Sequence, residues 1–123
     1  MPNKAFVNED GFSEIVLEGS QTADLTFEVI QKSIGFSNQL SSEGKEIKVL
    51  IDATKMIDLD LGAVQKATGA SAALAFDKLA IYGVAGENRT KMLQIISFGG
   101  KNKKGDIFDT REEAVEWLQK KEV

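Results

Sequence analysis

The sequence predicts one α/β domain built on a five-stranded mixed sheet, with strand order 1-2-3-4-5, a first strand antiparallel at the edge, and four helices. The length of 123 residues fits a single domain, residues 1–123. Short apolar runs alternate with longer segments of helical period, which favours parallel strands joined by right-handed crossovers. An Asp10-Gly11 pair between the first two runs is typical of a hairpin and makes the first strand antiparallel.

The N-terminal third predicts two strands and a long helix. The strands are residues 5–8 and 12–18, and imperfect alternation in the second predicts one partly buried face. The helix is residues 22–42, with Thr22 or Ser20 as its cap. Its core-facing stripe is predicted to consist of Leu25, Val29, Phe36 and Leu40, with Ile30 and Ile34 beside it.

The remaining elements alternate regularly. Residues 47–51 predict a buried strand that ends at Asp52, followed by a loop, a helix rich in small residues and another strand. The predicted ranges after the strand are loop 53–60, helix 61–76, strand 78–84, helix 87–98, loop 101–105, strand 106–108 and helix 111–121.

The last helix is predicted to begin after a cap at Asp109 or Thr110 and to have an apolar face. Thr110 and Glu113 have the spacing in which each side chain bonds the other's backbone. The face turned to the core is predicted to carry Ala114, Val115, Trp117 and Leu118. Replacing a buried aromatic residue by alanine typically costs about 3–5 kcal/mol, so Trp117→Ala is expected to destabilise the domain severely.

The composition limits the chemistry. The chain has no Cys and no His, which excludes disulfides, zinc sites of the usual kind and imidazole catalysis. We therefore assign no catalytic residue, no metal site and no cofactor. An enzyme would have to rely on carboxylates, Lys, Tyr82 or hydroxyls, and a carboxylate-dependent enzyme is the least favoured function.

The charge and hydropathy limit the partners. Fifteen Lys and Arg against nineteen Asp and Glu give a net charge of −4, which does not favour nucleic-acid binding. The longest apolar stretches are far short of a membrane span, and the N-terminus lacks the apolar core of a signal peptide. A cytoplasmic location is the expectation.

Two segments carry a resemblance to a known family. The first reads Lys48-Val49-Leu50-Ile51-Asp52-Ala53-Thr54, then Lys55-Met56-Ile57-Asp58, then Leu59-Asp60-Leu61-Gly62-Ala63-Val64. The second reads Ile107-Phe108-Asp109 and leads into Glu112, Glu113, Ala114, Trp117 and Leu118. Over about residues 5–121, this pattern resembles the STAS domain of sulfate transporters and anti-sigma-factor antagonists. The second segment looks like the STAS-like branch often grouped with CRAL-TRIO lipid-binding proteins.

The resemblance implies a protein partner bound at the turn into the second helix. Anti-sigma-factor antagonists have a phosphorylatable Ser or Thr there. In this chain either Leu61-Gly62 or Leu59-Asp60 takes that place, depending on the alignment, and neither pair has a hydroxyl. The resemblance therefore implies a binding module without the phosphorylation switch. The expected partner-binding residues are Thr54, Lys55, Asp58, Asp60 and Gly62.

The small residues of the second helix leave an alternative open. They are Gly62, Ala63, Ala67, Gly69, Ala70, Ala72, Ala73 and Ala75. Such residues permit tight packing on the sheet, and they also permit a shallow apolar pocket. The alternative function is therefore a carrier of a small, lipid-like apolar ligand, with Ala63, Ala67, Ala70 and Met92 as the expected contacts. A wide pocket would favour the carrier, whereas a flat apolar patch would favour a protein partner or a homodimer.

Asp52, Asp58 and Asp60 are a candidate group of oxygen ligands for Mg²⁺ or Ca²⁺. The favoured interpretation is structural: Asp52 caps a turn and Asp60 caps the second helix, because Asp is a preferred N-cap.

Two other segments have a weak resemblance to anion sites. Residues 83–87 (GVAGE) precede a helix but lack the spacing of a phosphate loop, so a plain turn is favoured. Lys101, Lys103 and Lys104 could attract an anion or an acidic lipid surface, although three lysines on a loop are usually a solvated turn.

Overall fold

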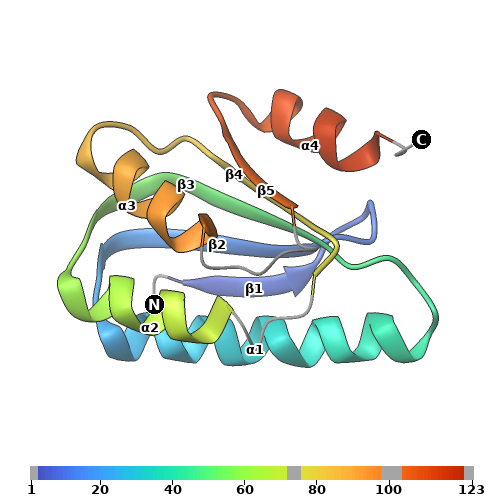
Figure 1. The fold of residues 1–123 in the computed structure, drawn as a ribbon. Helices are drawn as coiled ribbons and strands as arrows, with labels where there is room; N and C mark the ends of the chain where they lie inside the picture. Colours follow the sequence, from blue (N-terminus) through green and yellow to red (C-terminus); the bar gives the residue numbers. More distant parts are fainter. Residues whose placement is uncertain (1–2, 72–75, 98–103, 121–123) are drawn as a thin grey trace.

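A computed structural model describes residues 3–71, 76–97 and 104–120, and in that part of the chain it shows five strands and four helices (Figure 1). In chain order they are β1 (Lys4–Val7), β2 (Ser13–Gln21), α1 (Ala23–Ser42), β3 (Lys48–Leu59), α2 (Leu61–Ser71), β4 (Lys78–Tyr82), α3 (Glu87–Ser97), β5 (Lys104–Phe108) and α4 (Arg111–Gln119). The predicted order of elements is confirmed. None of the described helices is long and apolar enough to cross a lipid bilayer.

The strands form one sheet in the order β1-β2-β3-β4-β5, as predicted. β1 is antiparallel to β2, and the other neighbours are parallel. The hairpin turns at Gly11, whose φ of 82° is a conformation that glycine adopts without strain. The segment that was predicted as the buried third strand lies in the middle of the sheet, between β2 and β4.

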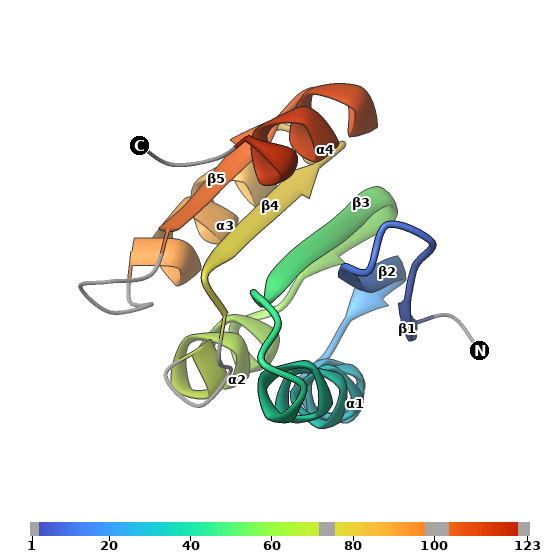
Figure 2. The ribbon, with the colours of Figure 1, turned by 90° about the vertical axis from the view of Figure 1, so that its right-hand side faces the viewer.

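The sheet has a different cover on each face (Figure 2). α1, α2 and α3 lie on one face, where Val29, Ala63 and Met92 enter the larger core cluster. α4 lies on the other face, where Ala114 and Leu118 enter a smaller cluster. The three crossover helices share a face because right-handed crossovers between successive neighbouring strands always place the helix on the same side.

β3 is longer than the sequence predicted, because residues 53–59 belong to the strand and not to a loop. The extension pairs with the second half of β2, which continues to Gln21. The pairing is irregular at two places, where β3 has one more residue than the facing part of β2. The first lies between Asp52 and Lys55, and the second lies between Met56 and Asp58. These two bulges interrupt the alternation of inward and outward side chains, so the segment lacks the sequence pattern of a strand.

Other element boundaries also differ from the predictions. β5 begins at Lys104, which the predicted loop 101–105 had included, and Phe76 lies outside α2. β4 ends at Tyr82 instead of residue 84. The predicted helix residues 72–75 and 98 lie outside the described residues.

The buried stripe of α1 is more polar than predicted. It consists of Thr26, Val29, Ser33, Ser37 and Leu40, whereas Leu25 and Phe36 are only partly buried. Small side chains allow the helix to approach the sheet closely, and the Ser33 and Ser13 hydroxyl oxygens share a buried hydrogen bond of 3.2 Å. The side-chain oxygens of Thr26 and Ser37 are buried and have no hydrogen-bond partner among the described residues.

α4 is held on its face by packing and by a buried cation. Leu118 is fully buried, whereas Trp117 is only partly buried and stacks at a tilt on Phe108, with 5.4 Å between the ring centroids. Lys78 is buried, and its Nζ donates to the carbonyl oxygens of Trp117 and Lys120 at 3.0 and 2.8 Å. A cation at a helix C-terminus is favourable because it compensates the negative end of the helix dipole.

These exposures change the expected ranking of two substitutions in α4. We expect Leu118→Ala to lower the free energy of unfolding by about 2–5 kcal/mol, because a fully buried aliphatic side chain leaves a cavity. Trp117→Ala should cost less than Leu118→Ala, since part of its ring already faces water. Urea denaturation of both variants measures the two losses, and a larger loss for Trp117→Ala would contradict the ranking.

Candidate functional site

The sheet edge that carries the predicted partner-binding residues is formed by the end of β3 and the start of α2. We call residues 54–62 the β3–α2 edge. β4 ends opposite Asp52, so the later residues of β3 pair only with β2. On the free side, α3 supports the segment through two side chains. Asn88 Nδ2 donates to the Ile57 carbonyl at 2.9 Å, and Lys91 Nζ donates to the Leu59 carbonyl at 2.7 Å.

Asp60 fixes the junction between strand and helix. Its Oδ1 accepts a hydrogen bond from the Ala63 backbone N–H at 2.7 Å, which is the N-cap geometry that the sequence predicted. Its own N–H donates to the Gln21 carbonyl at 3.1 Å. Asp60 is therefore bonded both to the first turn of α2 and to the end of β2, and these two contacts fix where α2 begins.

Two aliphatic side chains of this edge are exposed to solvent. Ile57 is 69% exposed and Leu61 is 72% exposed, the highest values for a large hydrophobic side chain in the described part of the chain. Leu59, between them, is buried in the core. Ile57 is the extra residue of the second β3 bulge and has no partner on β2, which explains why its side chain leaves the sheet.

The five predicted partner-binding residues lie on this edge, in different environments. Lys55, Asp58 and Asp60 are exposed. Thr54 is exposed too, but its N–H and its hydroxyl both donate to Asp52 Oδ1, at 2.9 and 2.6 Å. Gly62 lies against α1, where a Cβ atom would approach the Ala23 Cβ to 3.3 Å, so its place is explained by helix packing.

The predicted apolar-ligand residues are only partly gathered. Ala67 and Met92 line an apolar cavity of about 90 Å³ between the sheet and the three crossover helices. Ala63 is fully buried in the core cluster but does not line the cavity. The side chain of Ala70 lies outside the described part of the structure.

Two of the other candidate sites keep their structural interpretations, and the third, the lysine loop, lies almost entirely outside the described residues. Asp52 binds Thr54 and Asp60 caps α2, and no group of three potential metal ligands gathers within the described residues. The segment after β4 is a turn that begins at Gly83, whose φ is 82°. Lys101 and Lys103 lie outside the described residues, and only the backbone of Lys104 is described.

The sequence did not reveal an ion pair on the α4 face between a buried carboxylate and a partly exposed guanidinium. Glu14 is 5% exposed, and both of its carboxylate oxygens accept hydrogen bonds of 3.0 Å from the Arg111 guanidinium. Arg111 Nη1 also donates to the Tyr82 hydroxyl at 3.1 Å, and Asn8 Nδ2 donates to Glu14 Oε1 at 2.9 Å. A glutamate inside the apolar run 12–18 was the only sequence signal for this pair.

Three neighbouring side chains, those of Tyr82, Arg111 and Asp52, have shifted pKa values. Burial raises the pKa of Tyr82, so its hydroxyl stays protonated. Hydrogen bonds to Glu14 and Tyr82 raise the pKa of Arg111 against the effect of burial. Burial also acts to raise the pKa of Asp52, but hydrogen bonds from Thr54 and Tyr82 and the charge of Arg111 together hold it below the ordinary 3.8. All three pKa values move away from neutrality, and the contacts of Arg111 order the start of α4.

The lowered pKa of Asp52 makes part of the stability acid-sensitive. A carboxylate with a depressed pKa stabilises the folded state above its unfolded pKa, and this contribution is lost as the pH falls through the folded value. We expect wild type to be more stable than Asp52→Asn at pH 6, by under about 1 kcal/mol because the carboxylate is partly exposed. The difference should vanish near pH 2. Urea unfolding from pH 2 to 7 measures it, and a difference that does not change with pH would contradict the assignment.

Comparison with known proteins supports the fold. No family model matches the sequence, and no curated protein matches it either. Among solved structures, an uncharacterized protein of the DUF3478 family with a SpoIIAA-like fold, from Shewanella loihica, matches with a TM-score of 0.61 and 18% identity. The match covers 94% of this chain and 91% of that one. The anti-sigma factor antagonist SpoIIAA in its unphosphorylated form matches with a TM-score of 0.60 and 16% identity. This match covers 95% of the present chain and 97% of SpoIIAA. The chain therefore has the STAS-like fold that SpoIIAA has.

Proposed function

We propose that this chain is a non-catalytic binding or regulatory module that docks a protein partner through the β3–α2 edge. The observation that carries the proposal is the pair of exposed aliphatic side chains, Ile57 and Leu61, on a backbone held by α3 and by the Asp60 cap. Exposed apolar side chains that gather on one surface mark interaction sites, whereas single ones scattered over a surface are ordinary. The fold shared with an anti-sigma factor antagonist supports a regulatory role of this type.

The rigidity of the edge supports docking. A segment that is already ordered loses little conformational entropy when it binds, so more of the contact energy appears as affinity. Here the carbonyl groups of Ile57 and Leu59 are fixed by Asn88 and Lys91 on α3. The edge is therefore prepared to present its side chains in one geometry.

The charge of the edge suggests the chemistry of the partner. Asp58 and Asp60 are exposed beside the two aliphatic side chains. A complementary surface would have an apolar centre and basic residues at its rim, since charge complementarity favours encounter and orientation. Asp60 stands near the start of α2 with a carboxyl group, and neither Leu59-Asp60 nor Leu61-Gly62 has a hydroxyl that could be phosphorylated. We infer constitutive binding that no kinase switches.

The shifted pKa values of Asp52 and Tyr82 argue against the carboxylate-dependent enzyme. A general acid or base works best when its pKa lies near the working pH. The pKa of Asp52 is lowered and that of Tyr82 is raised, so both move away from neutrality. This cluster is better explained as the support of α4 on the sheet.

The first test removes the exposed aliphatic groups. We expect the double variant Ile57→Ser/Leu61→Ser to keep its fold, because surface substitutions usually change stability by less than about 0.5 kcal/mol. It should recover its partner from a native lysate at least about tenfold less well, as expected for the centre of an interface. Affinity capture with quantitative mass spectrometry measures the recovery.

Val7→Ser is the matched control for this experiment. Val7 is also exposed, at 42%, but it pairs with Ser13 at the opposite end of β2 from the edge. The control should recover the same proteins as wild type. Equal recovery by the double variant would refute docking through this edge. If wild type captures only itself and the double variant loses self-association in sedimentation, the partner is a second copy of the chain.

The second test separates the charge of Asp60 from its cap. Asparagine caps a helix about as well as aspartate does but carries no charge. We expect Asp60→Asn to lower the free energy of unfolding by no more than about 1 kcal/mol, the usual worth of an anion at a helix N-terminus. With Asp58→Asn added, partner recovery should fall and should lose much of its dependence on salt. Unchanged recovery and salt dependence would show that the carboxylates only serve the fold.

A further inference from the structure

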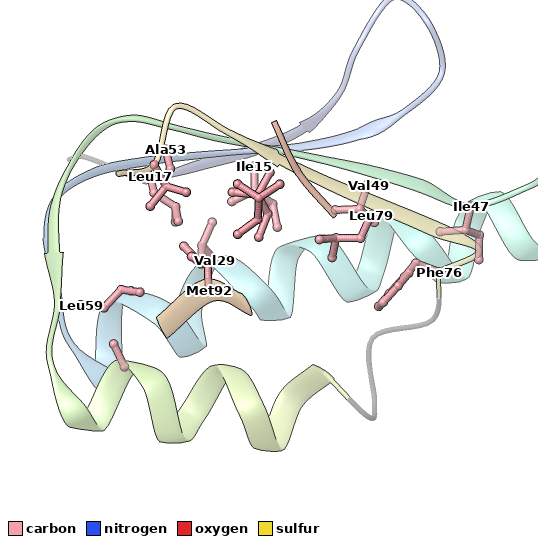
Figure 3. Close-up of a cluster of buried hydrophobic side chains, with 14 of the residues drawn as sticks. Ile15, Leu17, Val29, Ile47, Val49, Ala53, Leu59, Phe76, Leu79 and Met92 are labelled. Atoms are coloured by element: carbon pink, nitrogen blue, oxygen red, sulfur yellow. The ribbon is translucent and has the colours of Figure 1, made fainter. Parts of the chain in front are cut away.

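The apolar cavity lies between the sheet and the three crossover helices. Side chains of β2, β3 and β4 form its roof, and α1, α2 and α3 contribute the opposite walls (Figure 3). Leu59 and Phe76 lie toward opposite ends of the surrounding cluster, and Met92 points toward the sheet between them. Ile95 and Ile96 also line the cavity and are only partly buried, so the cavity approaches the surface.

The wall of this cavity is apolar throughout. The lining consists of apolar side chains together with Thr26 and Gln21. These two residues contribute carbon atoms only, and no nitrogen or oxygen atom of the described residues reaches the cavity surface. The amide of Gln21 is bonded instead to the Asn3 amide, at 2.7 and 3.1 Å, and to the Glu18 carbonyl at 3.0 Å. An occupant therefore finds no hydrogen-bond partner among these residues.

Such a wall excludes water and favours apolar molecules. A buried water molecule needs two to four polar partners, and an apolar cavity without them stays dry and takes up apolar compounds such as benzene or xenon. Protein interiors are otherwise close-packed, and the atoms that line an empty space lose dispersion contacts. A molecule without polar atoms would restore these contacts and would leave no polar group unpaired.

The space exists because α2 presents a small side chain to it. Ala67 is the described residue of α2 that lines the cavity, whereas Ala63, one turn earlier, is buried in the core cluster and does not line it. The walls from α1, α3 and the sheet carry larger side chains. A single longer side chain at position 67 would therefore fill the space, so the cavity depends on this alanine.

The volume limits the size of the occupant. An apolar protein cavity of about 150 Å³ holds benzene, and ordinary ligand pockets measure about 300–1,000 Å³. The present cavity of about 90 Å³ is smaller than both. In proportion to benzene, it suits roughly four non-hydrogen atoms, so a long acyl chain does not fit. A ligand of this size binds with a dissociation constant no lower than on the order of tens of micromolar.

We propose that this cavity is a binding site for a short hydrocarbon, of about four carbon atoms and without any polar atom. The ligand would contact Ala67 on α2, Met92 on α3 and Leu79 on β4. This proposal goes beyond partner docking and does not depend on it. From the β3–α2 edge the lining includes Leu59, whose side chain is buried, and neither of the two exposed aliphatic residues.

The test compares two probes of nearly equal size. n-Butane has no polar atom, and 1-propanol has a hydroxyl group in place of one of its methyl groups. Each probe is titrated into protein with ¹³C-labelled Ile and Met methyl groups. We expect n-butane to shift the methyl signals of Met92, Ile95 and Ile96. 1-Propanol should bind at least about tenfold more weakly, because its hydroxyl would lose its water partners and gain none.

Two variants of α2 test the location. Ala67→Met fills the space and should abolish the n-butane shifts. Gln65→Met is the matched control, because it introduces the same side chain into the same helix at an exposed position. This control should bind n-butane as wild type does. Circular dichroism verifies that each variant is folded, and Ala67→Val, with a smaller increase in volume, should weaken n-butane binding if Ala67→Met does not fold.

Three outcomes would overturn the proposal. The first is the absence of methyl shifts with n-butane in wild type. The second is equal affinity of wild type for n-butane and 1-propanol, which would contradict an apolar site. The third is an equal loss of n-butane binding in Gln65→Met and in the Ala67 variants, which would place the probe elsewhere. None of these outcomes concerns protein partners, so the failure of this site and the failure of the proposed docking edge can be told apart.

Discussion

In a sheet whose parallel strands follow one another in chain order, every right-handed crossover carries its helix to the same face. Here β2 to β5 are such a series, so α1, α2 and α3 share one side. That side contains the larger core cluster and the apolar cavity. The position of the β3–α2 edge follows too, because each crossover starts where its strand ends. The topology alone therefore determines where the β3–α2 edge and the apolar cavity lie in the fold.

The same constraint leaves the opposite face to one short helix. α4 follows the last strand and is not a crossover, so nothing in the topology determines its place. Buried polar contacts do so instead: Lys78 binds its C-terminal carbonyls and Arg111 pairs with Glu14. Leaving a buried charged group without its partner is strongly unfavourable. Glu14 and Lys78 are therefore better understood as selecting one position for α4 than as strengthening the core.

The sequence predicted the topology because its signals were local. Each signal depends on a few neighbouring residues: the spacing of apolar residues, the Asp10-Gly11 turn, and the caps at Thr22 and Thr110. The turn and both caps are found in the structure. It failed where the outcome depends on distant partners. Residues 53–59 became strand because β2 continues beside them. Likewise, Glu14 is buried because Arg111, far along the chain, reaches it.

The proposed docking edge combines residues that the sequence singled out with two that it did not. Family resemblance located the turn around Asp58 and Asp60, whereas Ile57 and Leu61 were overlooked. Their exposure cannot be read from the sequence, since an apolar residue after a buried strand usually continues the core. The polar stripe of α1 was missed for a related reason. Thr26 and Ser37 are polar, and a hydrophobic pattern assigns such residues to the surface, although both are buried.

The second β3 bulge places Ile57 outside the regular ladder, and this has an evolutionary consequence. Ile57 pairs with no residue of β2, so its loss would allow continuous pairing between Gly19-Ser20 and the flanking Met56 and Asp58. A lineage could therefore gain or discard this outward side chain through one inserted or deleted codon, while Leu59 stayed in the core. Related chains can therefore come to bind different partners through the insertion or deletion of single residues in this part of β3, while the rest of the sheet stays the same.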